Sequence, residues 1–107
     1  MKDQETTLKE LSKGIMQFRE GKGWRDYDTP KDLSMGISIE SGELMEHFFL
    51  SSEDEIQKKI DNEDKFIEIK RELADIIIYS VALANLLNID ISKTVEEKLD
   101  RIEERSK

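Results

Sequence analysis

The sequence has no cysteine, and its 107 residues include one proline, one tryptophan and one histidine. The absence of cysteine excludes disulfide bonds and zinc–thiolate sites. The longest strongly apolar run, residues 76–87, is too short to span a bilayer, and the N-terminus has no apolar stretch typical of a signal peptide. Basic residues are fewer than acidic ones, 17 against 25, and the resulting net charge of −8 disfavours binding to a nucleic acid polymer or an anionic membrane. We therefore expect a soluble, cytoplasmic protein.

Apolar residues recur every three or four positions, whereas no segment shows a clean period of two. This pattern predicts helices over about residues 4–20, 30–50, 64–87 and 91–105, and no strand. Ser52, with Glu55 three residues later, is a capping-box signal for a short helical turn or a mobile connector. Because the length is usual for one domain, we predict a single all-α domain over residues 1–107, folded as a small helical bundle.

Two pairs of acidic residues interrupt the apolar stripes of the second and third predicted helices. If Leu33 marks the centre of the first stripe, Glu40 lies about 20° from it and Glu43 about 80°. On the third predicted helix Glu72 lies among the apolar residues, and Asp75 lies about 60° away from it. Both pairs therefore point into the interior or towards its edge.

A buried carboxylate without a partner costs several kcal/mol, so it needs a cation, a proton or a metal ion. The same helix faces offer few basic residues, and oxygen ligands in this number suit Mg²⁺ or Mn²⁺. One acidic pair alone is usually explained as a solvated helix face, but two pairs inside apolar stripes favour a metal site. Iron is disfavoured, because di-iron bundles need Glu-x-x-His on two helices and the chain has only His47. We interpret His47 as a residue that lines the pocket or supports the structure.

The residues of these two helices resemble a known family. The segments "GISIESGELMEHFF" and "RELADIIIYSVALA" are similar to the all-α nucleoside triphosphate pyrophosphohydrolases of the MazG superfamily. The shared signature is Glu-x-x-Glu followed by Glu-x-x-Asp, here Glu40, Glu43, Glu72 and Asp75. Trp24 ahead of "TPKDL" resembles the deoxycytidine triphosphate pyrophosphatase branch in particular. The fold implied is a four-helix MazG-like bundle completed by oligomerisation.

The resemblance implies Mg²⁺-dependent hydrolysis of a (deoxy)nucleoside triphosphate, dCTP-like or with a modified base, to the monophosphate and pyrophosphate. Such a reaction serves nucleotide pool housecleaning. The four acids of the signature would be the catalytic residues and would bind Mg²⁺, with Mn²⁺ as a substitute, and one of them would also act as general base. The residues expected to bind the nucleotide are Trp24 at the base, Tyr79 near the sugar, His47 in the pocket, and Lys98 and Arg105 at the phosphates.

Each of these assignments has a structural alternative. Trp24 could anchor its loop, Tyr79 could be a core ring, and the charges of Lys98 and Arg105 could be solvated. The chain also departs from the branch: a second base-stacking tryptophan of the branch is replaced near Leu50, and the usual C-terminal ending is not kept. These departures bear on the preference for a base more than on the reaction.

Two other functions compete with this one. The first is a noncatalytic helical interaction protein whose acids bind a structural ion or a basic partner, and the second is a subunit that binds nucleotide without cleaving it. The first predicted helix has a full apolar stripe, and residues 76–87 are apolar nearly all round. One chain cannot easily bury both surfaces, so we predict a homodimer or a homotetramer with the active site close to the subunit contact.

Overall fold

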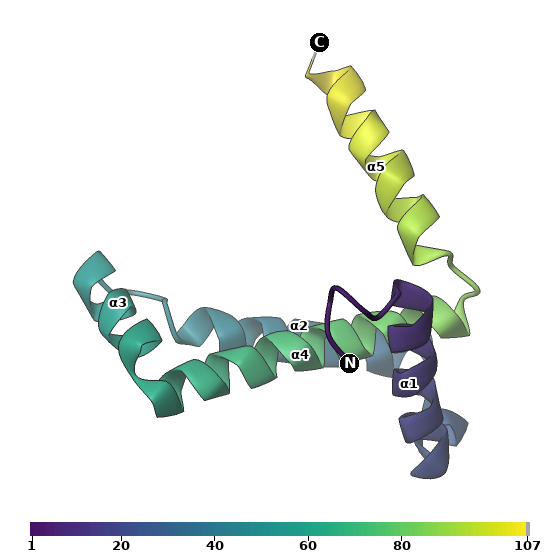
Figure 1. Ribbon diagram of the computed structural model, residues 1–107, viewed down its shortest axis with the longest axis horizontal. Coiled ribbons are helices and arrows are strands. Elements are labelled where there is room, and N and C mark those ends of the chain that lie inside the picture. The colour runs from purple at the N-terminus through teal and green to yellow at the C-terminus, as the bar shows by residue number, and fades with distance from the viewer. Residues whose placement is uncertain (107) are drawn as a thin grey trace. The chain divides into compact units, whose positions relative to one another are not determined.

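The computed structural model describes residues 1–106 and is built of helices, with no strand in that range (Figure 1). In chain order they are α1 (Leu8–Gly21), the 3-10 helix η1 (Trp24–Tyr27), α2 (Pro30–Glu46), α3 (Glu53–Asp61), α4 (Glu63–Leu86) and α5 (Ile91–Arg105). The prediction of an all-α protein is confirmed. Among the described residues no single helix is long and apolar enough to cross a membrane, although the bent pair of α4 and α5 passes the same test by length and composition.

Side-chain caps fix where several helices begin. A capping box between Thr7 and Glu10 starts α1, so this helix begins later than the periodicity alone predicts. The predicted capping box of Ser52 and Glu55 is confirmed at the start of α3. The Asp90 carboxylate accepts a hydrogen bond from the backbone N–H of Lys93 at 3.0 Å and starts α5 at its predicted residue.

The structure differs most from the predicted elements in the connection between α2 and α4. Helix α2 ends at Glu46, because the following N–H groups of His47 and Phe48 bond three residues back and the chain then turns at Leu50 with φ of 56°. The next segment is a nine-residue helix, α3, and not merely a turn or a mobile connector. The described chain therefore has five α-helices where four were expected.

The chain divides into two compact units. Unit 1 comprises residues 1–30 and 81–107, and unit 2 comprises residues 31–80. Helix α4 contributes to both, because its first part belongs to unit 2 and its last residues to unit 1. The single domain over residues 1–107 stays a prediction.

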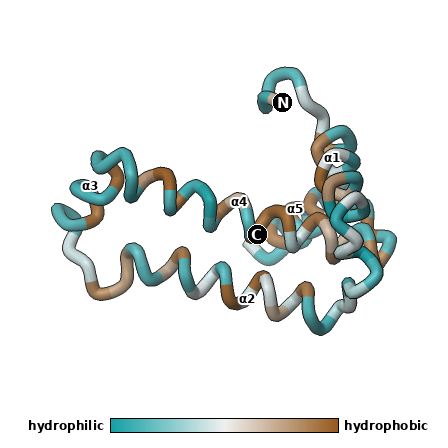
Figure 2. The backbone as a smooth tube through the Cα atoms, turned by 90° about the horizontal axis from the view of Figure 1, so that it is seen from below, coloured by the Kyte–Doolittle hydropathy of each residue, from teal (hydrophilic) through white to brown (hydrophobic). Residues whose placement is uncertain are grey.

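Unit 2 is a helical hairpin in which α2 and α4 run side by side in opposite directions, with α3 between them in the chain (Figures 1 and 2). Leu33 is buried, and Ile37, Glu40 and Leu44 are partly buried, whereas Met35 and Ile39 are exposed. The predicted inward face of α2, with Glu40 in it, is therefore the face that the helix buries. Brown apolar segments recur along both helices in Figure 2.

Unit 1 is held by polar contacts in addition to its apolar core. The Arg19 guanidinium in α1 lies 2.6 Å from the Asp28 carboxylate, and both side chains are nearly buried. The Asn85 amide at the end of α4 donates a hydrogen bond to the Ser12 hydroxyl at 2.9 Å. Asn88, with φ of 55°, then ends α4 in a left-handed conformation that asparagine tolerates better than most residues.

Gly36 and Gly42 of α2 make a matched pair for a test of hairpin packing. A Cβ atom at Gly36 would lie 2.8 Å from the Tyr79 ring, whereas one at Gly42 would meet nothing within 4 Å. We expect Gly36→Ala to destabilise the chain by about 1–3 kcal/mol through overpacking. Gly42→Ala should leave stability unchanged or raise it by up to about 1 kcal/mol, because alanine is the better helix former. Urea unfolding of both variants gives the comparison, and equal effects would contradict the close packing of α2 on Tyr79.

Candidate metal and nucleotide site

The four acidic residues of the signature lie in unit 2, on the two antiparallel helices of the hairpin. Glu40 and Glu43 come from α2, and Glu72 and Asp75 come from α4. In each pair the three-residue spacing places the two side chains about one helical turn apart on neighbouring positions of one face. Glu40, Glu72 and Asp75 are partly buried and Glu43 is exposed, so the group lies at the edge of the hairpin interior.

Glu40 has the other three carboxyl groups of the signature in its electrostatic environment. Burial raises the pKa of Glu40 above its ordinary value, because it penalises the charged form. The negative charges of Glu43, Asp75 and Glu72, together with side-chain hydrogen bonding to Glu43, raise the pKa further. The structure thus brings the four predicted residues together, and their repulsion favours any cation that binds between them.

The donor set fits a hard divalent cation, although the side chains do not enclose one. No group of three or more His, Cys, Asp or Glu side chains in residues 1–106 is arranged to hold a metal ion. The four side chains nevertheless offer only carboxylate oxygens, the ligands that Mg²⁺ and Mn²⁺ prefer. Binding of a metal ion between them stays a prediction.

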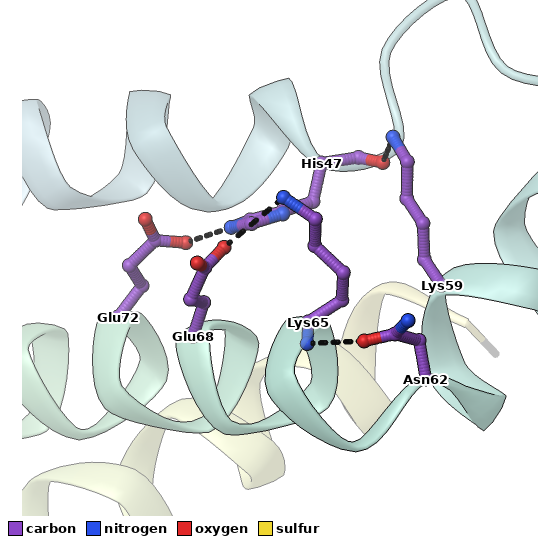
Figure 3. A network of polar contacts seen from close by, with 6 residues as sticks. All are labelled: His47, Lys59, Asn62, Lys65, Glu68 and Glu72. Carbon is purple, nitrogen blue, oxygen red and sulfur yellow. Dashed lines mark hydrogen bonds and ion pairs between the residues drawn. The ribbon is translucent and has the colours of Figure 1, made fainter.

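His47 contacts one member of this group. Its Nε2 atom lies 2.6 Å from Glu72 Oε2, with 14% and 21% of the two side chains exposed. The His47 carbonyl oxygen in turn accepts a hydrogen bond from the Lys59 ammonium group of α3 (Figure 3). His47 thus contacts a predicted metal ligand through its side chain and is bonded to α3 through its backbone carbonyl.

Comparison with known proteins identifies the family. The model of the MazG-like family matches residues 35–107, the part of the chain that contains all four acids. The chain belongs to the MazG-like family. The predicted membership, read from Glu-x-x-Glu and Glu-x-x-Asp, is confirmed.

Individual relatives agree with this assignment. The MazG-like chain is 29% identical over 101 residues to dCTP pyrophosphatase 1 of Rattus norvegicus, covering 94% of the chain and 59% of that protein. It is 28% identical over 96 residues to dCTP pyrophosphatase 1 of Homo sapiens, covering 90% and 56%. The chain therefore spans less than two thirds of the length of these relatives. The predicted resemblance to the dCTP pyrophosphatase branch is confirmed by these matches.

A solved structure shows the same fold. The crystal structure of a pyrophosphatase from Archaeoglobus fulgidus DSM 4304 superposes with a TM-score of 0.82 at 32% sequence identity, covering 98% of the MazG-like chain and 96% of the other. The all-α MazG-like fold is therefore shared over nearly the whole length.

Tyr79 lies in the same unit as the four acids. Its ring is partly buried and packs over Gly36 of α2, one helical turn beyond Asp75. Packing on Gly36 fits the structural alternative of a core ring, and it also holds the ring beside the acidic group. The contact with a sugar stays a prediction for this member of the MazG-like family.

Trp24 lies in unit 1, within a small aromatic and basic cluster. Its ring meets Phe18 edge-on at 5.7 Å between centroids, and the Arg19 guanidinium lies 5.7 Å from the Trp24 ring centre. The Arg19–Asp28 ion pair fixes both ends of the segment that carries η1, and 47% of Trp24 remains exposed. The ring is thus anchored by its loop and still open to a ligand. Sequence reasoning missed the ion pair, because Arg19 lies at the edge of an apolar stripe and no local signal marks its partner.

Lys98 and Arg105 lie on α5 in unit 1 and are exposed. The structure therefore brings His47 and Tyr79 into one unit with the four acids, and leaves Trp24, Lys98 and Arg105 in the other. The phosphate contacts predicted for Lys98 and Arg105 stay predictions.

The raised pKa of Glu40 gives a test that needs no substrate. Because the folded-state pKa is raised, the stability that protonated Glu40 contributes is present below the ordinary pKa and is lost as the pH rises through the raised value. In the absence of divalent cations we expect Glu40→Gln to melt at a higher temperature than the natural chain at neutral pH. The difference should shrink as the pH falls towards 4.5, the ordinary value.

Thermal melts in EDTA across this pH range make the measurement. Glu96→Gln, an exposed residue on α5, is the matched control and should behave like the natural chain at every pH. Added Mg²⁺ should raise the melting temperature of the natural chain and have less effect on Glu40→Gln. A natural chain that Mg²⁺ does not stabilise would count against the metal site.

Proposed function

We propose that this chain is a Mg²⁺-dependent nucleotide pyrophosphohydrolase that converts a (deoxy)nucleoside triphosphate, dCTP-like or with a modified base, to the monophosphate and pyrophosphate. The observation that supports it most is the placement of the four signature acids on the two helices of one antiparallel hairpin, with Glu40 on the buried face of α2. The relatives, dCTP pyrophosphatase 1 and a pyrophosphatase, point to the same chemistry. Removal of triphosphates from the nucleotide pool is the corresponding physiological role.

In this proposal the carboxylates of Glu40, Glu43, Glu72 and Asp75 hold the magnesium ions. The ions supply the chemistry the chain lacks: they offset the charge of the triphosphate and lower the pKa of a bound water. One of the four carboxylates would take the proton from the attacking water. A protein with a net charge of −8 can thus bind a polyanion without a glycine-rich phosphate loop.

The remaining residues position the substrate. Trp24 offers an exposed ring face to a base, Tyr79 lies one turn beyond Asp75 for the sugar, and Lys98 and Arg105 supply positive charge for phosphates. His47 contacts Glu72, so it would orient that carboxylate from its expected place in the nucleotide pocket.

The reaction is tested by incubating the chain with a panel of normal and modified triphosphates plus Mg²⁺ and measuring pyrophosphate. We expect kcat to fall by at least about 100-fold in Glu40→Gln and in Asp75→Asn, since losing a metal ligand costs several kcal/mol of barrier and about 1.4 kcal/mol is tenfold. Glu96→Gln is the control and should keep full activity. Pyrophosphate release that survives both ligand substitutions would point to a contaminant, and no release from any triphosphate would refute the reaction.

We also propose that the chain works as a homodimer or a homotetramer. The outer side of α2 exposes Met35, Ile39 and Met45 by 50–56%, and α4 exposes Leu73 and Ile77 by 50% and 43%. Exposed apolar residues in this number on one hairpin are typical of a protein contact. The acidic group lies on the same two helices, so the contact would come close to the site.

Ile39→Arg tests the assembly, because it places a charge in the middle of the exposed apolar side of α2. We expect this variant to sediment as a smaller species than the natural chain, because a charged group at the contact lowers the affinity between subunits. Gln57→Arg on the exposed side of α3 adds the same charge elsewhere and should leave the sedimentation coefficient unchanged. A natural chain that sediments as an active monomer would contradict the assembly.

A further inference from the structure

A cavity of about 350 Å³ adjoins the acidic group at the end of the hairpin where α2, α3 and α4 meet. It is lined by Glu43, Glu46, His47, Lys59, Lys65 and Glu72. Two of these, Glu43 and Glu72, are members of the predicted metal-binding group. The cavity is therefore continuous with that group and adds two ammonium groups to it (Figure 3).

The two lysines come from different helices and are held in different ways. The Lys59 ammonium of α3 donates a hydrogen bond to the His47 carbonyl oxygen and is partly buried. Lys65 lies in the first turn of α4, where its backbone N–H is capped by the Asn62 side chain at 3.0 Å. Its ammonium lies 3.7 Å from the Glu68 carboxylate, and 53% of the side chain is exposed. Each ammonium carries three donors, so both retain N–H groups for a ligand.

The lysines lie in a definite direction from the acidic group. Lys65 precedes Glu72 by seven residues in α4, which is about 10 Å along the helix axis. Asp75 and Tyr79 lie in the opposite direction along the same helix. A triphosphate bound through metal ions at Glu72 and Asp75 would extend beyond them, and at the α3 end it would meet ammonium groups of opposite charge.

We propose that this cavity binds the terminal phosphates of the triphosphate, with Lys59 and Lys65 as the binding residues. The inference rests on the proposed function and names which part of the substrate the hairpin recognises at this end. The lysines would favour triphosphates over diphosphates and monophosphates, which do not reach the cavity in the same way. They would also hold the pyrophosphate product before it leaves.

The experiment uses inorganic tripolyphosphate with Mg²⁺ as a probe, so that binding is measured without turnover. We expect Lys59→Met and Lys65→Met each to weaken tripolyphosphate binding by about tenfold in isothermal titration calorimetry, which is about 1.4 kcal/mol, and the double variant by more than either. Lys58→Met and Lys70→Met remove the same charge from exposed positions on the same two helices and should weaken it by less than twofold.

Kinetics with the best triphosphate of the panel supply a second readout. The lysine variants should raise KM and the inhibition constant of pyrophosphate about tenfold, while inhibition by the monophosphate product stays unchanged. If Lys59→Met fails to fold for want of its contact with His47, Lys65→Met still decides the matter, because its ammonium pairs only loosely with exposed Glu68.

The outcomes separate this inference from the proposed function. If the natural chain releases pyrophosphate and the double variant equals Lys58→Met in KM and in tripolyphosphate binding, the cavity is not the phosphate site although the reaction stands. Lower melting temperatures without any loss of binding would mean that the lysines only neutralise neighbouring acids. If the natural chain releases no pyrophosphate, the proposed function fails, and calorimetry alone decides whether the two lysines bind a polyphosphate.

Discussion

Like charges on facing helices repel, and unit 2 places Glu43, Asp75 and Glu72 where their charges act on Glu40. Burial and these neighbouring charges together raise the pKa of Glu40 above its ordinary value. A hairpin of α2 and α4 that buried only leucine and isoleucine would be more stable in isolation, so the acids serve something other than the fold. Other residues of the unit pack close to the acids. Gly36 leaves room for the Tyr79 ring against α2, and His47 contacts Glu72.

The sequence predicted those parts of the site that depend on helical periodicity. A residue's angle around a helix follows from its number alone, so Glu40 could be placed on the inward face before any coordinates, and α4 and α5 begin within a residue of expectation. The residues at which helices end were less predictable. Glu46 and Leu50 carry no proline or glycine signal, yet α2 stops there and the backbone turns with positive φ at Leu50.

Contacts between elements that are distant in sequence were not predictable from one sequence. The Arg19–Asp28 ion pair and the reach of Lys59 to the His47 carbonyl depend on how segments return on one another. Lys59 and Lys65 look like ordinary surface charges in the strongly charged stretch that follows Ser52. They line a cavity together with Glu43 and Glu72. This cavity forms only when α3 is folded between α2 and α4, so the sequence alone does not indicate it.

Helix α4 runs without a break from Glu63 to Leu86, and both units contain residues of this helix. Each residue advances the helix by about 100° and lengthens it by about 1.5 Å. A single insertion between Asp75 and Asn85 would therefore turn the Asn85 amide, which bonds Ser12, to another face of α4. Length changes among relatives should accordingly gather in the connections at residues 22–29 and 47–52, while the stretch between these two side chains keeps its number of residues.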